Sequence, residues 1–122
     1  MNAHVIVSTF HILFVVPLFL YVAFTRAATS EAVYWSVFAL GLFVFVYHSY
    51  KASVRYMAAS TYLWVNLLHC LVIAPLMIYI GYLGKKTPRP AYELLAILGF
   101  GALGYHMYNI VTQLQLVDKD DT

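Results

Sequence analysis

Charged residues are scarce in this chain of 122 residues: they make up 10% of it, whereas apolar residues make up 63%. A soluble domain carries about a quarter charged residues, so this composition is too apolar for a protein that folds in water. The single cysteine excludes an intrachain disulfide. The net charge of +2, without a basic patch or a Gly-rich phosphate loop, gives no indication of nucleic-acid binding. No paired carboxylates or nucleophile–base pair are visible, so an enzyme is not the expected class.

Long uncharged runs are what the sequence has in abundance. Each is close to or above the roughly 18 residues that indicate a membrane-spanning helix. The first run lacks a basic segment before it and a clear cleavage site after it, so we interpret it as a span and not as a signal peptide. The sequence therefore predicts an all-α, four-helix transmembrane bundle with helices at about residues 4–24, 32–56, 62–83 and 91–116.

An internal repeat relates the two halves of the chain. Tyr47-His48-Ser49-Tyr50 recurs as Tyr105-His106-Met107-Tyr108, an offset of 58 positions (105 − 47), and the same offset gives thirteen identities between residues 7–55 and 65–113. A random pairing of this composition would give about three or four, so we interpret the pattern as a tandem duplication. Matched leucines and valines are common among apolar helices, but matched histidines, prolines, glycines and tyrosines in one register are not.

The repeat predicts the organisation of the bundle. Residues 1–58 form one helical hairpin, residues 59–117 form the second, and residues 118–122 form an acidic tail. A repeat unit with two spans places its copy in the same orientation, so we expect pseudo-twofold symmetry about an axis along the membrane normal. The two termini are then expected on the same side of the membrane. Lysine and arginine are almost evenly divided between the two sides, so the orientation stays open.

Some repeated residues are expected to shape the helices rather than to do chemistry. Pro17 and Pro75 interrupt the first and third helices at equivalent places, where each removes a backbone hydrogen bond and is expected to kink its helix. Gly41 and Gly99 lie in the middle of repeated stripes and are expected to let neighbouring helices approach closely.

Four histidines are the candidate functional residues. His11, His48, His69 and His106 occupy one position in each predicted helix, and each pair related by the offset is identical. At about 1.5 Å per residue, all four lie roughly 10–12 Å below the same surface. The sequence therefore predicts a layer of four imidazoles inside the bundle. Asn66, at the position equivalent to Ser8, could form a hydrogen bond across helices.

Repeated tyrosines are the candidate supporting residues. We expect a second polar layer near the opposite surface, and tyrosines beside the histidines as second-shell or relay groups. These residues are Tyr21, Tyr79, Tyr34 and Tyr92 for the layer, and Tyr47 and Tyr105 beside the histidines.

Three interpretations of the histidine layer remain open. The imidazoles could bind a transition metal such as zinc, copper or iron, or hold a b-type haem, since no CxxCH motif is present. They could instead carry protons or ions, because imidazole titrates near neutral pH. Finally, each ring could simply bond a neighbouring helix and staple the bundle together.

Three stretches of the second half stand out together: Val65-Asn66-Leu67-Leu68-His69, Ala74 to Tyr82, and Gly104-Tyr105-His106. With these stretches, the chain resembles a small, uncharacterised family of four-helix membrane proteins from large DNA viruses of algae and other protists. The resemblance implies a membrane-embedded protein of a viral or host-cell membrane, and it assigns no binding residue.

The predicted partners follow from the bundle's small size. Four helices leave a large perimeter facing the lipid bilayer, so self-association into a homo-oligomer is expected. The alternative class of function is a structural or assembly protein of a membrane, such as the membrane of a virion.

Overall fold

The computed structural model describes residues 2–120, except for the side chains of residues 117 and 120. Helices account for nearly all of it. The first half contains α1 (Ala3–Phe10), the π-helical turn η1 (His11–Val15), α2 (Val16–Thr25), the 3-10 turn η2 (Arg26–Ala28) and α3 (Glu31–Met57). The second contains α4 (Leu63–Leu68), the π-helical turn η3 (His69–Ile73), α5 (Ala74–Leu83), the 3-10 turn η4 (Gly84–Lys86) and α6 (Arg89–Asp120).

Four continuous helical segments are long and apolar enough to cross a membrane: Ala3–Ala28, Glu31–Met57, Leu63–Lys86 and Arg89–Leu116. The predicted all-helical chain with four long apolar helices is confirmed. The last helix is longer than expected, because α6 continues to Asp120 instead of ending near Leu116. The predicted acidic tail is therefore helical as far as the structure describes it, and residues 121–122 lie outside the described residues.

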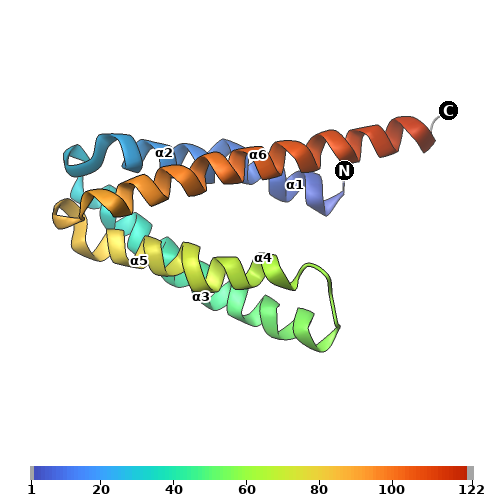
Figure 1. Cartoon of the computed structure of the whole chain (residues 1–122), viewed down its shortest axis with the longest axis horizontal. Helices are drawn as coiled ribbons and strands as arrows, with labels where there is room; N and C mark the ends of the chain where they lie inside the picture. The colour runs from blue at the N-terminus through green and yellow to red at the C-terminus, as the bar shows by residue number, and fades with distance from the viewer. Residues whose placement is uncertain (1, 121–122) are drawn as a thin grey trace. The chain divides into compact units, whose positions relative to one another are not determined.

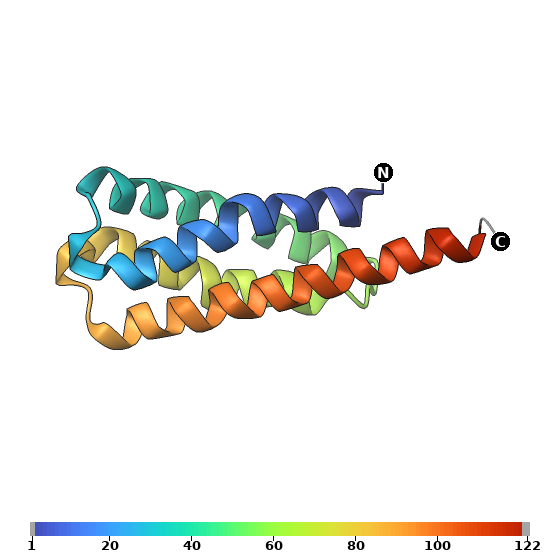
Figure 2. The same ribbon diagram turned by 90° about the horizontal axis from the view of Figure 1, so that it is seen from above.

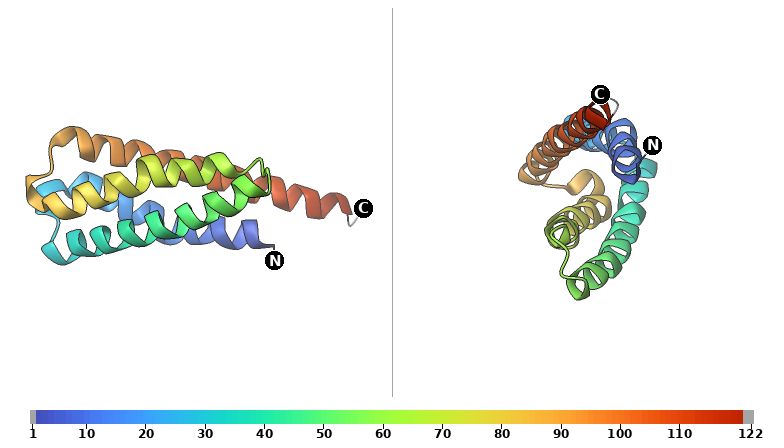
Figure 3. Two further views of the ribbon diagram at one scale, coloured as in Figure 1. Left: turned by 90° about the horizontal axis from the view of Figure 1, so that it is seen from below. Right: turned by 90° about the vertical axis from the view of Figure 1, so that its right-hand side faces the viewer.

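The chain divides into two compact units. Unit 1 comprises residues 1–24 and 93–122, and unit 2 comprises residues 25–92. In unit 1, α1 and α2 run antiparallel to α6 (Figure 1), and the side chain of Asn2 donates to that of Gln113 at 2.5 Å. In unit 2, α3 packs along α4, η3 and α5, which run in the opposite direction (Figures 2 and 3).

Helix boundaries follow from local chemistry. Ser30 caps α3 by accepting a hydrogen bond from the Val33 amide at 3.4 Å. Gly84 ends α5 with a φ of +55°, a conformation that glycine adopts without steric cost. Arg26, which stands 58 positions earlier, has a φ of +49° at the end of α2. A side chain bearing a Cβ is strained there, so this turn in the first half is held by its surroundings.

Both prolines lie two residues after the last residue of a π-helical turn. Pro17 is the second residue of α2 and Pro75 the second residue of α5. The amide of Val16 bonds the carbonyl of His11, and the amide of Ala74 bonds that of His69, each five residues back. A proline cannot donate to the preceding turn and its ring crowds the carbonyl there, and the wider turn accommodates both effects. The sequence predicted the interruption but not its π-helical form.

Candidate functional site

In unit 2, two of the four histidines form a stacked pair. His48 lies on α3 and His69 begins η3, and their ring centroids are 4.0 Å apart with an angle of 14° between the planes. Both side chains are half-buried. One residue further along each helix, Ser49 Oγ lies 3.5 Å from Cys70 Sγ, a second polar contact between the same two helices.

A chain of hydrogen bonds fixes the ring of His48. Arg55 Nη1 donates to Asn66 Oδ1 at 2.5 Å, and Asn66 Nδ2 lies 2.9 Å from His48 Nδ1. A guanidinium has only donors, so it sets the orientation of the Asn66 amide and leaves the NH₂ group facing the ring. His48 Nδ1 therefore accepts, and the neutral ring carries its proton on Nε2. Asn66, in the middle of this chain, is only 2% exposed, whereas Arg55 and His48 at its ends are half-buried.

His69 has the opposite tautomer. Its Nδ1 lies 2.6 Å from the carbonyl oxygen of Val65, one helical turn earlier. A carbonyl can only accept, so Nδ1 carries the proton. The lone pair of the neutral ring is then on Nε2, which is its proton-accepting and metal-binding atom.

Unit 1 contains a second stacked pair. His11 begins η1 and His106 lies on α6, with ring centroids 4.4 Å apart and an angle of 22° between the planes. His11 Nδ1 lies 2.8 Å from the carbonyl oxygen of Val7, so it also donates to its own helix. His106 Nδ1 lies 3.0 Å from Ser8 Oγ. A serine hydroxyl can donate or accept, so the tautomer of His106 is not fixed in the way that of His48 is.

The two histidine pairs are formed and contacted by residues at equivalent positions of the repeat. Ser8 and Asn66 stand 58 positions apart, as do Val7 and Val65, and the two π-helical turns begin at equivalent histidines. The structure thus brings the predicted histidines together two by two, one pair in each unit. A single layer made of all four stays a prediction.

The predicted tyrosines have different environments. Tyr34 and Tyr92 are 2% and 3% exposed, and their hydroxyl oxygens lie 2.7 Å apart. The Tyr34 hydroxyl also donates to the carbonyl of Arg26 at 2.6 Å. In contrast, Tyr21 and Tyr79 are 52% and 47% exposed, and a layer shared by all four tyrosines stays a prediction. The tyrosines beside the histidines also differ, since Tyr47 is exposed and Tyr105 is half-buried; each makes an edge-on ring contact with its neighbouring histidine.

Both predicted glycines lie at close helix contacts. A Cβ at Gly41 would lie 2.9 Å from Met77 Cβ and 3.0 Å from the Ile78 amide nitrogen. A Cβ at Gly99 would lie 2.9 Å from Leu20 Cδ2, the mobile end of a side chain. The tightest contact involves Gly81, where a Cβ would lie 2.5 Å from the backbone nitrogen of Phe38. Sequence reasoning missed Gly81, because its equivalent in the first half is Ala23.

The geometry of each pair limits the metal chemistry that it supports. A metal ion lies in the plane of a ligating imidazole, about 2.0–2.1 Å from the nitrogen. Two nearly parallel rings 4.0 Å apart cannot both meet this condition for one ion. Each pair therefore offers one ligand to a given ion, and the described residues contain no group of three or more His, Cys, Asp or Glu side chains that could hold a metal.

Haem does not fit between the rings of either pair. Axial ligands approach the iron from opposite faces of the macrocycle, so the macrocycle separates their rings. Rings that stack on one another at 4.0 and 4.4 Å leave no space for it.

Comparisons with known proteins give no relative. No model of a protein family, no curated protein and no solved structure matches this chain.

Two parts of the site were only partly visible in the sequence. Asn66 was expected to bond across helices, and it does, to His48. Arg55 lies near the end of α3, and its guanidinium donates to the Asn66 side chain. The sequence positions of these three residues indicate a hydrogen-bond chain from Arg55 through Asn66 to His48 only when the pairing of their two antiparallel helices is known.

Proposed function

We propose that the protein is a multi-pass integral membrane protein that binds and transfers protons through its two histidine pairs. The observation that carries this proposal is the stacking of two imidazoles within each unit, at 4.0 and 4.4 Å, in helices apolar enough to span a membrane. Ionisable side chains inside a membrane are costly, so a bundle that keeps four of them has a use for them.

The pair geometry supports proton handling. Free imidazole titrates near pH 6.5, so a ring can gain or lose a proton near neutrality. Two imidazolium charges about 4 Å apart repel by about 4 kcal/mol at an effective dielectric constant near 20. A stacked pair therefore holds one proton more readily than two. Such a site can take up a proton and release it again, which is what transfer along a path requires.

The repeat is part of the same proposal. We propose that gene duplication produced two tandem hairpins with pseudo-twofold symmetry and with both termini on one side of the membrane. Thirteen identities at one offset support it, and so do π-helical turns, 3-10 turns and ring pairs at equivalent positions. Exchanging the halves converts the pair His11–His106 into the pair His69–His48, so the duplication accounts for the existence of two similar sites.

The test is proton flux into liposomes that contain the purified protein and a trapped pH-sensitive dye, driven by a potassium diffusion potential. Replacing His48 or His106 with phenylalanine keeps a planar ring but removes both nitrogens. We expect the flux to fall on the order of a hundredfold, the usual effect of removing a proton-transferring side chain.

His4→Phe is the matched control, because His4 belongs to neither pair and its equivalent in the second half is Tyr62. Its flux is expected to equal that of the unmodified protein. Liposomes with the unmodified protein that leak no faster than empty ones would disprove the proposal. Flux that survives both pair substitutions, with only a lower melting temperature, would assign the histidines a purely structural role.

A further inference from the structure

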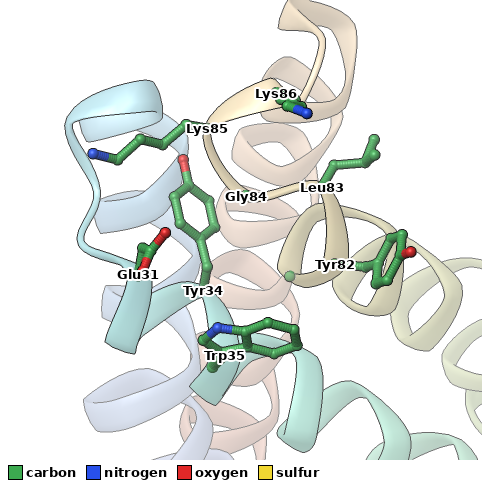
Figure 4. Close-up of a pocket in the computed structure, with 9 residues that line it drawn as sticks. Glu31, Tyr34, Trp35, Tyr82, Leu83, Gly84, Lys85 and Lys86 are labelled. Carbon is green, nitrogen blue, oxygen red and sulfur yellow. The ribbon is translucent and has the colours of Figure 1, made fainter.

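At the end of unit 2 that carries the two 3-10 turns, the structure has a pocket of about 190 Å³. Figure 4 shows the residues that line it: Glu31, Tyr34 and Trp35 of α3, and Lys85 and Lys86 of η4, with the Lys85 side chain extending past Tyr34 toward the side of Glu31. Two lysines and one glutamate are among the lining residues, so the formal charges of the lining sum to +1 (2 − 1). This charge matches one phosphodiester.

The pocket lies at the level of a membrane surface if the four helices span a bilayer. Glu31 begins one candidate span and Lys86 ends the next. Trp35 and Tyr82, which also line the pocket, are 56% and 70% exposed. Exposed tryptophan and tyrosine beside lysine are typical of the level at which lipid headgroups meet the hydrocarbon.

An apolar groove continues from the pocket. It has a volume of about 650 Å³ and lies between α3 and α5, and Tyr82 lines both spaces. Phe38, Leu42 and Ile78 are among the side chains that line it. The ring of Phe38, in the groove, contacts two rings of the pocket. Its centroid lies 5.6 Å from that of Trp35 and 6.4 Å from that of Tyr82. A ligand that fills both must carry a charged group on an apolar chain.

We propose that this face of unit 2 binds an anionic glycerophospholipid, with its phosphate at Lys85 and Lys86 and one acyl chain in the groove. A soluble phosphate compound would leave the groove unused. A zwitterionic lipid would leave one positive charge of the lining without a counterpart. Basic pockets between membrane helices bind anionic headgroups by the same attraction.

The inference rests on the integral-membrane part of the proposed function and not on proton transfer. Flotation of the reconstituted protein with liposomes tests membrane insertion separately, so failure of that part is distinguishable from failure of the lipid site. Loss of the proton-flux proposal would leave the lipid site unaffected, because no histidine contributes to it.

The experiment uses Trp35 as a reporter, in the variant Trp64→Phe, which removes the other tryptophan. The protein is placed in phosphatidylcholine bilayers with a small fraction of phosphatidylglycerol, and either lipid is brominated on its acyl chains to quench fluorescence on contact. At equal mole fraction we expect apparent binding to Trp35 to be about fivefold stronger for phosphatidylglycerol, given the surface attraction of a single net charge.

Lys85→Gln with Lys86→Gln is expected to remove this preference, and Glu31→Gln is expected to increase it. Lys51→Gln is the matched control, because Lys51 lies on α3 far from the pocket and should leave the preference unchanged. Equal quenching by the two lipids in the Trp64→Phe protein would overturn the proposal. So would stronger quenching by brominated phosphatidylethanolamine than by phosphatidylglycerol.

Discussion

Gly81→Leu is expected to lower the melting temperature of the detergent-solubilised protein by roughly 10 °C or more, the consequence of forcing a large side chain into a packed contact. A single Cβ at this position would already lie 2.5 Å from the backbone nitrogen of Phe38 and 2.6 Å from its Cα. Backbone atoms cannot move aside as a side chain can, so α5 and α3 must separate. The measurement is thermal unfolding followed by circular dichroism.

Gly101→Leu is the matched control for this prediction. Apart from its own stretch of helix, no atom lies within 4 Å of a Cβ at Gly101, so a side chain there starts in open space. Leucine also favours a helix more than glycine does, by up to about 1 kcal/mol. The control should therefore melt at or above the temperature of the unmodified protein. Equal melting temperatures for the two variants would show that α3 and α5 are not packed as the structure has them.

Asn66→Leu is expected to destabilise the protein by about 2–3 kcal/mol, because it leaves polar partners without their hydrogen bonds. Leucine has a similar volume, so the loss is not one of packing. The substitution removes the acceptor of Arg55 Nη1 and the donor to His48 Nδ1, and the site is only 2% exposed. The measurement is the free energy of unfolding, obtained by denaturant titration in mixed micelles.

Two further variants separate the hydrogen bonds from general effects. Asn66→Ser restores the residue that Ser8 provides at the equivalent place and should recover part of the loss. Asn109→Leu makes the same chemical change at a half-buried position of α6 and should cost little. If Asn66→Leu and Asn109→Leu destabilise equally, the chain from Arg55 to His48 contributes nothing to stability.

The four helices could be predicted because their cause is local. Uncharged runs of about 20 residues have few alternatives to helices that cross a bilayer, and charged or proline-containing stretches separate them. The close helix contacts at Gly41 and Gly99 could also be predicted, since these two glycines recur at the repeat offset. Gly81 was invisible to the same reasoning, because a repeat reveals only what both copies retain.

Helix pairing could not be predicted from the same pattern. Identical histidines 58 positions apart indicate equivalent roles, but they do not state which helix faces which. The structure pairs His11 with His106 and His48 with His69, so each pair joins residues that are not equivalent. Tyr21 is also retained in both copies, yet its side chain is 52% exposed, because retention does not specify the direction in which a side chain points.

The amide of Asn66 connects the permanent cation of Arg55 to the imidazole of His48 in one fixed orientation. Its oxygen is committed to Arg55, so only its nitrogen side is presented to His48. An acidic side chain at position 55 would attract the opposite end of the amide, which would rotate by half a turn and move the hydrogen of His48 from one ring nitrogen to the other. In the other half, Gln113 stands at the position of Arg55 and accepts a hydrogen bond from Asn2, while the Ser8 hydroxyl that contacts His106 can donate or accept. The substitutions at these two positions therefore leave the hydrogen of His48 assigned to one ring nitrogen by its neighbours, without an equivalent assignment at His106.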